Sequence, residues 1–474
     1  MTGCRLNKFS KLFIFATLGV VIIVSCSKEH KPTPIQSVIP KDELPNIKPR
    51  GNENYLKQNS DYVYDHTKIK TYELIITKDG LAKIDANPAA EEYVEAALIF
   101  EGDTISPVGV RYKGSIGAFG GCLSGPDWVH PDGRKVCEKL SMQIKINWND
   151  RKERFFDLNK LQFHAQNYDK SQLRERLAYW LFGQMGVPAP RTVHARLIIN
   201  KKYSGLYGLV EEIDNRFAEY FYKEGKGNVY KEVWPVKPNG EPESDKAFIE
   251  ALKTNEEEQD IKFIKEFGQA IAGSNLSNSK DLVRKYMNLN EILSYIVVDR
   301  AIRHDDGPFH WYCADATVNS CENHNYYWFE DKKNKKMHLI PWDMDGAFEQ
   351  VLLTSNPYTG IADKLGEISN NCLPFSFGAG RKQRSAACDK LTAAWLSFNP
   401  EYNAIKKDFQ SNFVANNKIL SQLNVWAKQI EPFIMEADQI HNKGIDKEIN
   451  KKTTTIIVWD NATNALRSQV KGIL

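Results

Sequence analysis

Residues 339–348 read Leu-Ile-Pro-Trp-Asp-Met-Asp-Gly-Ala-Phe, an apolar run that leads into two carboxylates. The apolar residues predict a buried strand, and Asp343 and Asp345 follow where this strand ends. Side chains spaced i, i+2 lie near one edge of a strand, where oxygen ligands can hold a divalent cation. The segment therefore indicates a cation site, with a simple turn cap as the alternative interpretation.

Further polar residues precede this segment. Asp305 and Asp306 follow a predicted helix over residues 289–302, and Asn325 starts a predicted hairpin. Phosphoryl transfer needs a carboxylate that orients the attacking hydroxyl, and a carboxylate with an amide that holds Mg²⁺. Asp305 or Asp306, Asn325 and Asp343 supply these groups in that order. The alternative is that the Asp-Asp-Gly sequence makes a turn and Asn325 only begins a strand.

The periodicity of apolar residues divides the chain into two parts. Alternation with a period of two begins near Lys68, whereas helical spacing dominates after about Pro238. We therefore predict an α+β fold with two lobes, divided as a protein kinase is: a sheet-rich N-terminal lobe over 68–237 and a helical C-terminal lobe over 238–474. The expected strands are 71–77, 96–100, 107–112, 141–148, 193–199, 207–210, 325–329 and 337–341; the expected helices are 171–185 with Ser171 as N-cap, 245–272, 279–285, 289–302 and most of 391–474.

The N-terminus carries a targeting signal. Arg5, Lys8 and Lys11 precede an apolar run over 12–24 that is short for a membrane span. The sequence Ile-Val-Ser-Cys that ends at Cys26 resembles the lipobox of bacterial lipoproteins. It implies a signal peptide over 1–25, a lipid on Cys26 and a place in the cell envelope, periplasmic or at the outer surface. The alternative is an uncleaved signal anchor. The stretch that follows Cys26 is rich in Pro, Lys, Glu and Asn without apolar periodicity, which predicts a flexible tether over 26–67.

Cysteine usage agrees with export. Of the 8 cysteines, Cys4 lies in the signal and Cys26 at the lipobox, which leaves an even number for an oxidising compartment. Metal ligation is the alternative, but no Cys-x-x-Cys spacing or accompanying His pair is present. The expected disulfides close three local loops and join Cys122 to Cys137, Cys313 to Cys321, and Cys372 to Cys388.

The charge balance argues against a nucleic-acid partner. Lys and Arg number 63 against 60 Asp and Glu, so the net charge is only +3. Such a chain has no broad positive field to attract phosphate backbones. Membrane contact is expected through the N-terminal lipid only.

Short pieces in a fixed order carry a resemblance to a known family. They are Gly109-Val-Arg-Tyr-Lys-Gly-Ser115, Lys139-x-Ser-x-x-Ile-Lys145, Arg174-Glu175, Gly186-Val-Pro-Ala-Pro-Arg191, Gly205-Leu-Tyr-Gly-Leu-Val-Glu211, Tyr230-Lys231, Asp305-Asp306, Asn325-Tyr-Tyr and Ile340-Pro-Trp-Asp-x-Asp345. The ordered set, over about 71–348, resembles the CotH family, which is similar to a reduced protein kinase and is associated with ATP-dependent protein phosphorylation.

The resemblance implies an atypical kinase that uses ATP and Mg²⁺, or Mn²⁺ or Ca²⁺, to phosphorylate a protein acceptor. It assigns the metal to Asp343 with Asp345 or Asn325, and catalysis to Asp305 or Asp306. The residues expected to bind the nucleotide are Arg111, Lys113, Lys139, Lys145, Glu211 and Lys231.

Two other functions remain open at this level. One is a surface or periplasmic binding lipoprotein that keeps a kinase-like fold without transfer chemistry. The other is a structural protein whose acidic cluster binds Ca²⁺. The discriminating observation is whether the aspartates at 305, 306 and 343 and Asn325 converge in space beside at least one of the cations.

Overall fold

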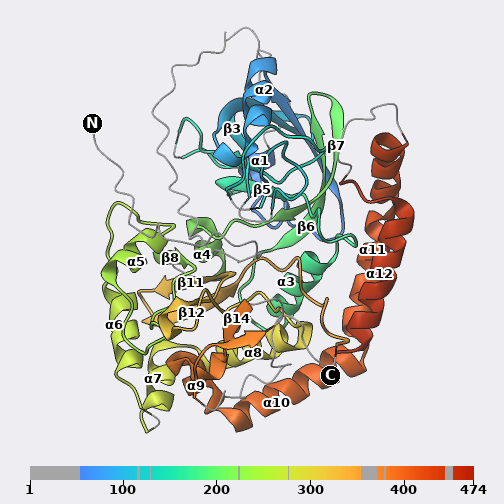
Figure 1. Ribbon diagram of the computed structural model, residues 1–474. Helices are drawn as coiled ribbons and strands as arrows, with labels where there is room; N and C mark the ends of the chain where they lie inside the picture. Colours follow the sequence, from blue (N-terminus) through green and yellow to red (C-terminus); the bar gives the residue numbers. More distant parts are fainter. Residues whose placement is uncertain are drawn as a thin grey trace.

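The computed structural model describes residues 54–473 except 115–117, 129, 151, 223–224, 276, 354–370, 378–380 and 444–451. A β-barrel, drawn in blue and green, lies above a larger body of helices and small sheets (Figure 1). The chain is therefore an α+β protein, as the sequence predicts. The signal peptide, Cys26 and most of the predicted tether lie outside the described residues. No helix among the described residues combines the length and the apolar character needed to cross a bilayer.

The barrel is closed and has the strand order β1-β2-β3-β4-β5-β7-β6, in which β6 lies parallel beside β1. In β1 the side chains of Tyr72, Leu74 and Ile76 are buried in alternation, which is why this segment forms a half-buried strand. Closure leaves no open sheet edge. The strands are β1 (Lys70–Ile76), β2 (Val94–Phe100), β3 (Asp103–Tyr112), β4 (Met142–Lys145), β5 (Lys160–His164), β6 (Thr192–Ile199) and β7 (Lys202–Val210).

The barrel has its own hydrophobic core. The ring centroid of Tyr72 lies 4.8 Å from that of Phe100 and 5.3 Å from that of Phe163. Val63 and Tyr64, ahead of the first strand, are also buried against this core. The packed part of the chain thus begins before Lys68, because these two apolar side chains lie on the barrel.

One face of β3, β4 and β5 is polar. Arg111 pairs in register with Gln143, and Gln143 with Gln162, so the three side chains point to the same side. Directly paired residues with the opposite orientation, such as Met142 and Phe163, are buried in the core. We call this the polar face of the barrel; its members are Arg111, Lys113, Gln143, Lys145, Lys160, Gln162 and His164.

The second body combines helices with two small sheets around a separate core. The sheets have the orders β12-β11-β8 and β10-β9-β14-β13. The helix α11, in red, runs beside the barrel strands β6 and β7, and α12 packs against α11 (Figure 1). The helices are α1 (Asn54–Lys57) and α2 (Lys78–Ala86) beside the barrel, then α3 (Arg174–Gln184), α4 (Asn215–Phe221), α5 (Asp245–Ala251), α6 (Lys262–Ala272), α7 (Ser279–Tyr286), α8 (Leu289–Ile302), α9 (Lys390–Leu396), α10 (Asn399–Phe409), α11 (Lys418–Ala437) and α12 (Ile456–Lys471). The remaining strands are β8 (Gly227–Lys231), β9 (Trp311–Cys313), β10 (Cys321–Glu322), β11 (Tyr326–Asp331), β12 (Lys336–Pro341), β13 (Phe375–Phe377) and β14 (Arg381–Arg384).

Most predicted elements are present, with informative differences. Helix α8 has the predicted bounds, and β11 and β12 form the predicted hairpin. The N-cap predicted at Ser171 is wrong, because the helix begins later, at Arg174. There Asp169 accepts the Arg174 backbone N–H (2.9 Å) and also the Ser171 hydroxyl (2.6 Å).

All three predicted disulfides are present, and each closes a local loop, as expected from the spacing. Because all six sulfurs are bonded in pairs, the alternative that these cysteines ligate a metal is wrong. The bridge between Cys313 and Cys321 joins β9 to β10, since the two residues are partners in that ladder. The Cα–Cα distances are 4.8 Å between Cys122 and Cys137, 3.9 Å between Cys313 and Cys321, and 5.6 Å between Cys372 and Cys388.

Candidate functional site

The end of the β11–β12 hairpin places Asp343 beside Asn325. The Trp342 N–H donates to the Asn325 carbonyl (3.3 Å), one pair beyond the regular ladder. The backbone of Asp343 is held on both sides: its N–H donates to the Tyr179 hydroxyl (3.0 Å), and its carbonyl lies 3.0 Å from His304 Nε2. These two contacts hold the backbone of Asp343 in place at a φ of +55°.

Asn325 connects this strand end to the chain after α8. Its Nδ2 donates to the Asp306 carbonyl (2.8 Å) and to Asp306 Oδ2 (2.9 Å). Its backbone N–H donates to Glu232 (3.1 Å). Both side-chain bonds use the nitrogen, so the amide oxygen of Asn325 keeps its capacity as a cation ligand.

The carboxylates of this cluster repel one another. Burial and the nearby charge of Glu175 raise the pKa of Asp343, and Asp306 adds to this effect. Burial and Asp343 hold the pKa of Asp345 well above its usual value. A divalent cation would offset this repulsion.

The donor set is small but suits Mg²⁺. Within the described ranges, no group of three or more His, Cys, Asp and Glu side chains has the arrangement of a metal site. Mg²⁺ is usually held by one or two carboxylates and completes its octahedron with water and phosphate oxygens. Asp343, Asp345 and the Asn325 amide oxygen fit that mode of binding, whereas a full protein cage for Ca²⁺ would need more ligands.

The two neighbouring aspartates have different surroundings. The Asp305 carboxylate lies 3.3 Å from His310, 3.8 Å from Arg303 and 3.9 Å from Arg300. Although burial opposes ionisation, the hydrogen bond from His310 and the two guanidinium charges lower the pKa of Asp305. Asp306 is exposed and faces Asn325. Of the pair, Asp306 belongs to the Asp343 cluster.

Two of the expected cations also lie at the cluster. Lys231, at the end of β8, pairs in register with Tyr327; burial works against its charge, but Tyr327, Glu232 and Asp343 raise its pKa. Lys113 follows β3 on the polar face, and its Nζ lies 5.3 Å from the ring centroid of Trp342, next to Asp343. Burial lowers the pKa of Lys113 to about 8, with Lys231 contributing to the shift.

The other expected cations lie further along the barrel. Arg111 forms an ion pair with Glu91 and lies 5.1 Å from the Tyr93 ring, and Lys145 lies 5.8 Å from the same ring. Both are on the polar face. Lys139 is elsewhere: its Nζ donates to the Leu206 carbonyl (2.8 Å), and burial lowers its pKa to about 7. Among the described residues it makes no contact with Asp343, Asn325 or Asp306.

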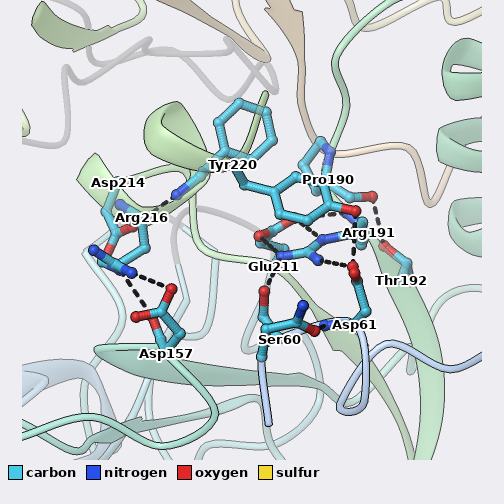
Figure 2. A network of polar contacts seen from close by, with 12 residues as sticks. Ser60, Asp61, Asp157, Pro190, Arg191, Thr192, Glu211, Asp214, Arg216 and Tyr220 are labelled. Atoms are coloured by element: carbon cyan, nitrogen blue, oxygen red, sulfur yellow. Dashed lines mark hydrogen bonds and ion pairs between the residues drawn. The ribbon is translucent and has the colours of Figure 1, made fainter. Parts of the chain in front are cut away.

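Glu211 is held by an arginine outside the cluster, as Figure 2 shows. Both of its carboxylate oxygens accept bonds from Arg191, whose Nη2 also donates to Ser60 Oγ (2.8 Å) and whose Nη1 donates to Asp61 Oδ1 (2.9 Å). This network fastens the segment before β1 to the strands β6 and β7. The adjacent Glu212 instead accepts from Gln143 on the polar face (3.0 Å).

Sequence reasoning missed several residues that surround the cluster. Glu175, on α3, and His164, on β5, form a pair at 2.9 Å beside Asp343, and His304 supports the Asp343 backbone. Glu212 contributes to the pKa shifts of both Lys113 and Lys231. The Arg174-Glu175 piece did mark α3, but only the folded register shows which of its side chains faces Asp343.

The architecture and this cluster define a kinase-like protein: a barrel with a cationic polar face meets a helical body that carries the aspartates and the asparagine. A family model described as CotH kinase protein matches residues 110–465, which is more than half of the chain. The chain belongs to the CotH family. The match contains every residue of the cluster and continues into α12, beyond the 71–348 region of the sequence resemblance. No curated protein matches the chain.

Proposed function

We propose that this protein transfers the terminal phosphate of Mg-ATP to a hydroxyl group of a protein in the cell envelope. The observation that carries the proposal is the convergence of Asp343, Asn325 and Asp306 beside the ammonium groups of Lys113 and Lys231. Phosphoryl transfer needs positioned carboxylates, an amide and cations rather than a covalent enzyme intermediate.

Each residue has a role in this proposal. Asp343, Asp345 and the Asn325 amide oxygen hold Mg²⁺, which neutralises phosphate charge when it is bound. Lys113 and Lys231 bind phosphate oxygens from the barrel side and from β8. Asp306 accepts the proton of the attacking hydroxyl, whose oxygen bonds to the terminal phosphorus while the bond to the leaving ADP breaks.

Nucleotide binding tests this function directly. Wild-type protein should bind Mg-ATP by calorimetry, and removal of Mg²⁺ or the substitution Asp343→Ala should abolish binding and transfer together, because the bound polyphosphate loses its main counter-charge. A wild-type protein that binds no Mg-ATP refutes the enzyme and supports the surface binding protein as the alternative.

The cellular location is a further part of the proposal. The lipobox at Cys26 and the three disulfides support a lipid-anchored protein in an oxidising compartment. Cys26→Ala should release the body from the membrane fraction, because it removes the acceptor for the lipid. A variant that remains membrane-bound and uncleaved would instead indicate a signal anchor.

A further inference from the structure

A hydrogen-bonded chain of three side chains links the polar face of the barrel to α3. Lys113 Nζ lies 3.1 Å from His164 Nε2, and His164 Nδ1 lies 2.9 Å from Glu175 Oε1. Lys113 also donates to the amide oxygen of Gln162. Within the described part of the chain, the Lys113 ammonium therefore meets an amide and an imidazole, and the carboxylate is one residue further away.

The partners of His164 select one form of its ring. An ammonium group can only donate, so Nε2 must accept, and the Glu175 carboxylate accepts, so Nδ1 must carry the proton. His164 is then a neutral imidazole with Nδ1–H. In this form the buried Glu175 carboxylate fixes the orientation of the His164 ring, and the ring in turn fixes the position of the Lys113 ammonium.

Neighbouring residues hold both ends of this hydrogen-bonded chain, Glu175 at one end and Lys113 at the other. Glu175 is only 1% exposed, and its neighbour Arg174 donates to the Ala347 carbonyl (2.7 Å) just after Asp345. The Trp342 ring packs edge-on against His164, with centroids 5.8 Å apart, and lies below the Lys113 ammonium. The same tryptophan precedes Asp343, so the position of Lys113 is tied to that of the proposed metal ligand.

We propose that His164 is a positioning residue, which orients Lys113 toward the phosphates of the nucleotide through a bridge that replaces a direct contact between lysine and glutamate. This inference rests on the proposed function. In protein kinases a strand lysine must pair with a helix glutamate for activity. Among the residues that the structure describes, the interposed imidazole leaves the Lys113 ammonium without a carboxylate in contact, so its charge remains available to a phosphate.

Substitutions at His164 distinguish the effect of its hydrogen bond to Lys113 from that of its hydrogen bond to Glu175. His164→Phe keeps a ring against Trp342 but removes both bonds, and we expect kcat/KM for Mg-ATP to fall by about 10²-fold, the effect of misplacing a group that binds the reacting phosphate. In His164→Gln the amide oxygen can reach the place of Nε2 and accept from Lys113. In His164→Asn the shorter amide reaches only the place of Nδ1. We therefore expect Gln to restore much of the ATP affinity, and Asn to leave KM raised.

A second His–Glu pair provides a matched control. His338 Nδ1 lies 2.8 Å from Glu291 Oε1, its side chain is 8% exposed against 15% for His164, and it lies on β12 toward the turn of the hairpin, away from Asp343. His338→Phe should cost folding stability in the same way as His164→Phe while leaving KM and kcat unchanged. Equal kinetic losses in the two variants, or none in either, would overturn the positioning role.

A spectroscopic measurement tests the bridge without nucleotide. In ¹⁵N spectra of the full chain, His164 should be neutral with the proton on Nδ1, and Lys113→Met should shift the Nε2 resonance. A proton on Nε2 would overturn the bridge, whether or not the protein binds ATP. If the wild type shows the expected tautomer but binds no Mg-ATP, the proposed function and the phosphate role of Lys113 both fail, although the hydrogen-bonded chain itself stands. If it binds Mg-ATP and His164→Phe binds equally well, only the positioning role fails.

Discussion

At the scale of single residues, Asp305 and Asp306 are adjacent in the sequence but lie in different surroundings. Asp305 lies among His310, Arg300 and Arg303, whereas Asp306 is exposed beside Asn325. The turn after α8 causes this separation, because the last helical position is followed by Arg303 in a left-handed conformation (φ +52°). One aspartate therefore faces the helical body and the next faces the proposed site.

The pair gives a direct test of the catalytic assignment. Asp306→Asn should lower the rate of phosphate transfer by about 10²- to 10⁴-fold, the usual contribution of a positioned base, while Mg-ATP still binds. Asp305→Asn should instead lower the free energy of unfolding by about 3 kcal/mol, because it removes the carboxylate beside the buried guanidinium group of Arg303. Denaturant unfolding and single-turnover transfer measure the two effects. If transfer is lost only at Asp305, the assignment is reversed.

The residues that the sequence singled out at one strand end lie close together in the structure. Asp343, Asn325 and an aspartate of the 305–306 pair were predicted to be close, and the hairpin brings them together. The sequence did not show that Lys113 lies beside Asp343 whereas Lys139 and Glu211 lie away from it. Each is a charged residue on or beside a strand, and only the closed barrel determines which of these charges faces Asp343 and which meets Leu206 or Arg191.

At the scale of elements, strong periodicity or a tight turn made a segment predictable. Helix α8 begins after Asn288, whose side chain caps it, and its bounds were predicted correctly. The four-stranded sheet β10-β9-β14-β13 was not predicted, because its strands have only two to four residues, too few for a periodic signal. Disulfides and distant pairing stabilise it instead.

The bridge between Cys313 and Cys321 belongs to that sheet and lies on the path between Asp306 and Asn325. Each local bridge restricts the unfolded chain, so its removal should cost about 2 to 3 kcal/mol of unfolding free energy. We expect this loss from the double substitution of Cys313 and Cys321 by Ser, together with slower transfer, because the segment that carries Asn325 becomes less restrained. Chemical unfolding and a transfer assay measure these changes.

The bridge between Cys122 and Cys137 is the matched control. It also closes a local loop, the longer of the two, with a sequence separation of 15 against 8, and it lies on the barrel near Lys139 rather than between the two site segments. Its removal should lower stability by a similar amount and leave transfer by the folded protein unchanged. If both removals slow transfer equally, the sheet has no special role at the site.

At the scale of the whole molecule, a buried arginine lies where the barrel, α3 and α11 meet. Arg176 is 1% exposed, and its NH1 donates to Gln429 Oε1 (2.9 Å) on α11 and lies 3.0 Å from His194 Nδ1 on β6. Its guanidinium group stacks on Trp426, 4.1 Å from the ring centroid. Burial alone lowers the pKa of Arg176 to about 9. The junction therefore requires a neutral His194, since a second buried positive charge would be poorly compensated.

This requirement predicts acid sensitivity of the packing between the two bodies. Burial, and then the charge of Arg176, lower the pKa of His194 to about 3, against 6.5 for the ordinary group. Between these values the unfolded chain binds a proton that the folded chain does not, so the stability that neutral His194 contributes is fully present above pH 6.5 and declines as the pH falls. From pH 6.5 to 5 this loss amounts to about 2 kcal/mol. The side chain in His194→Gln can keep the bond to the Gln172 carbonyl but cannot be protonated. Its unfolding free energy should therefore change less steeply with pH over this range, by the uptake of about one proton. Denaturant unfolding at several pH values measures that slope, and parallel curves for wild type and variant would show that His194 does not govern the junction.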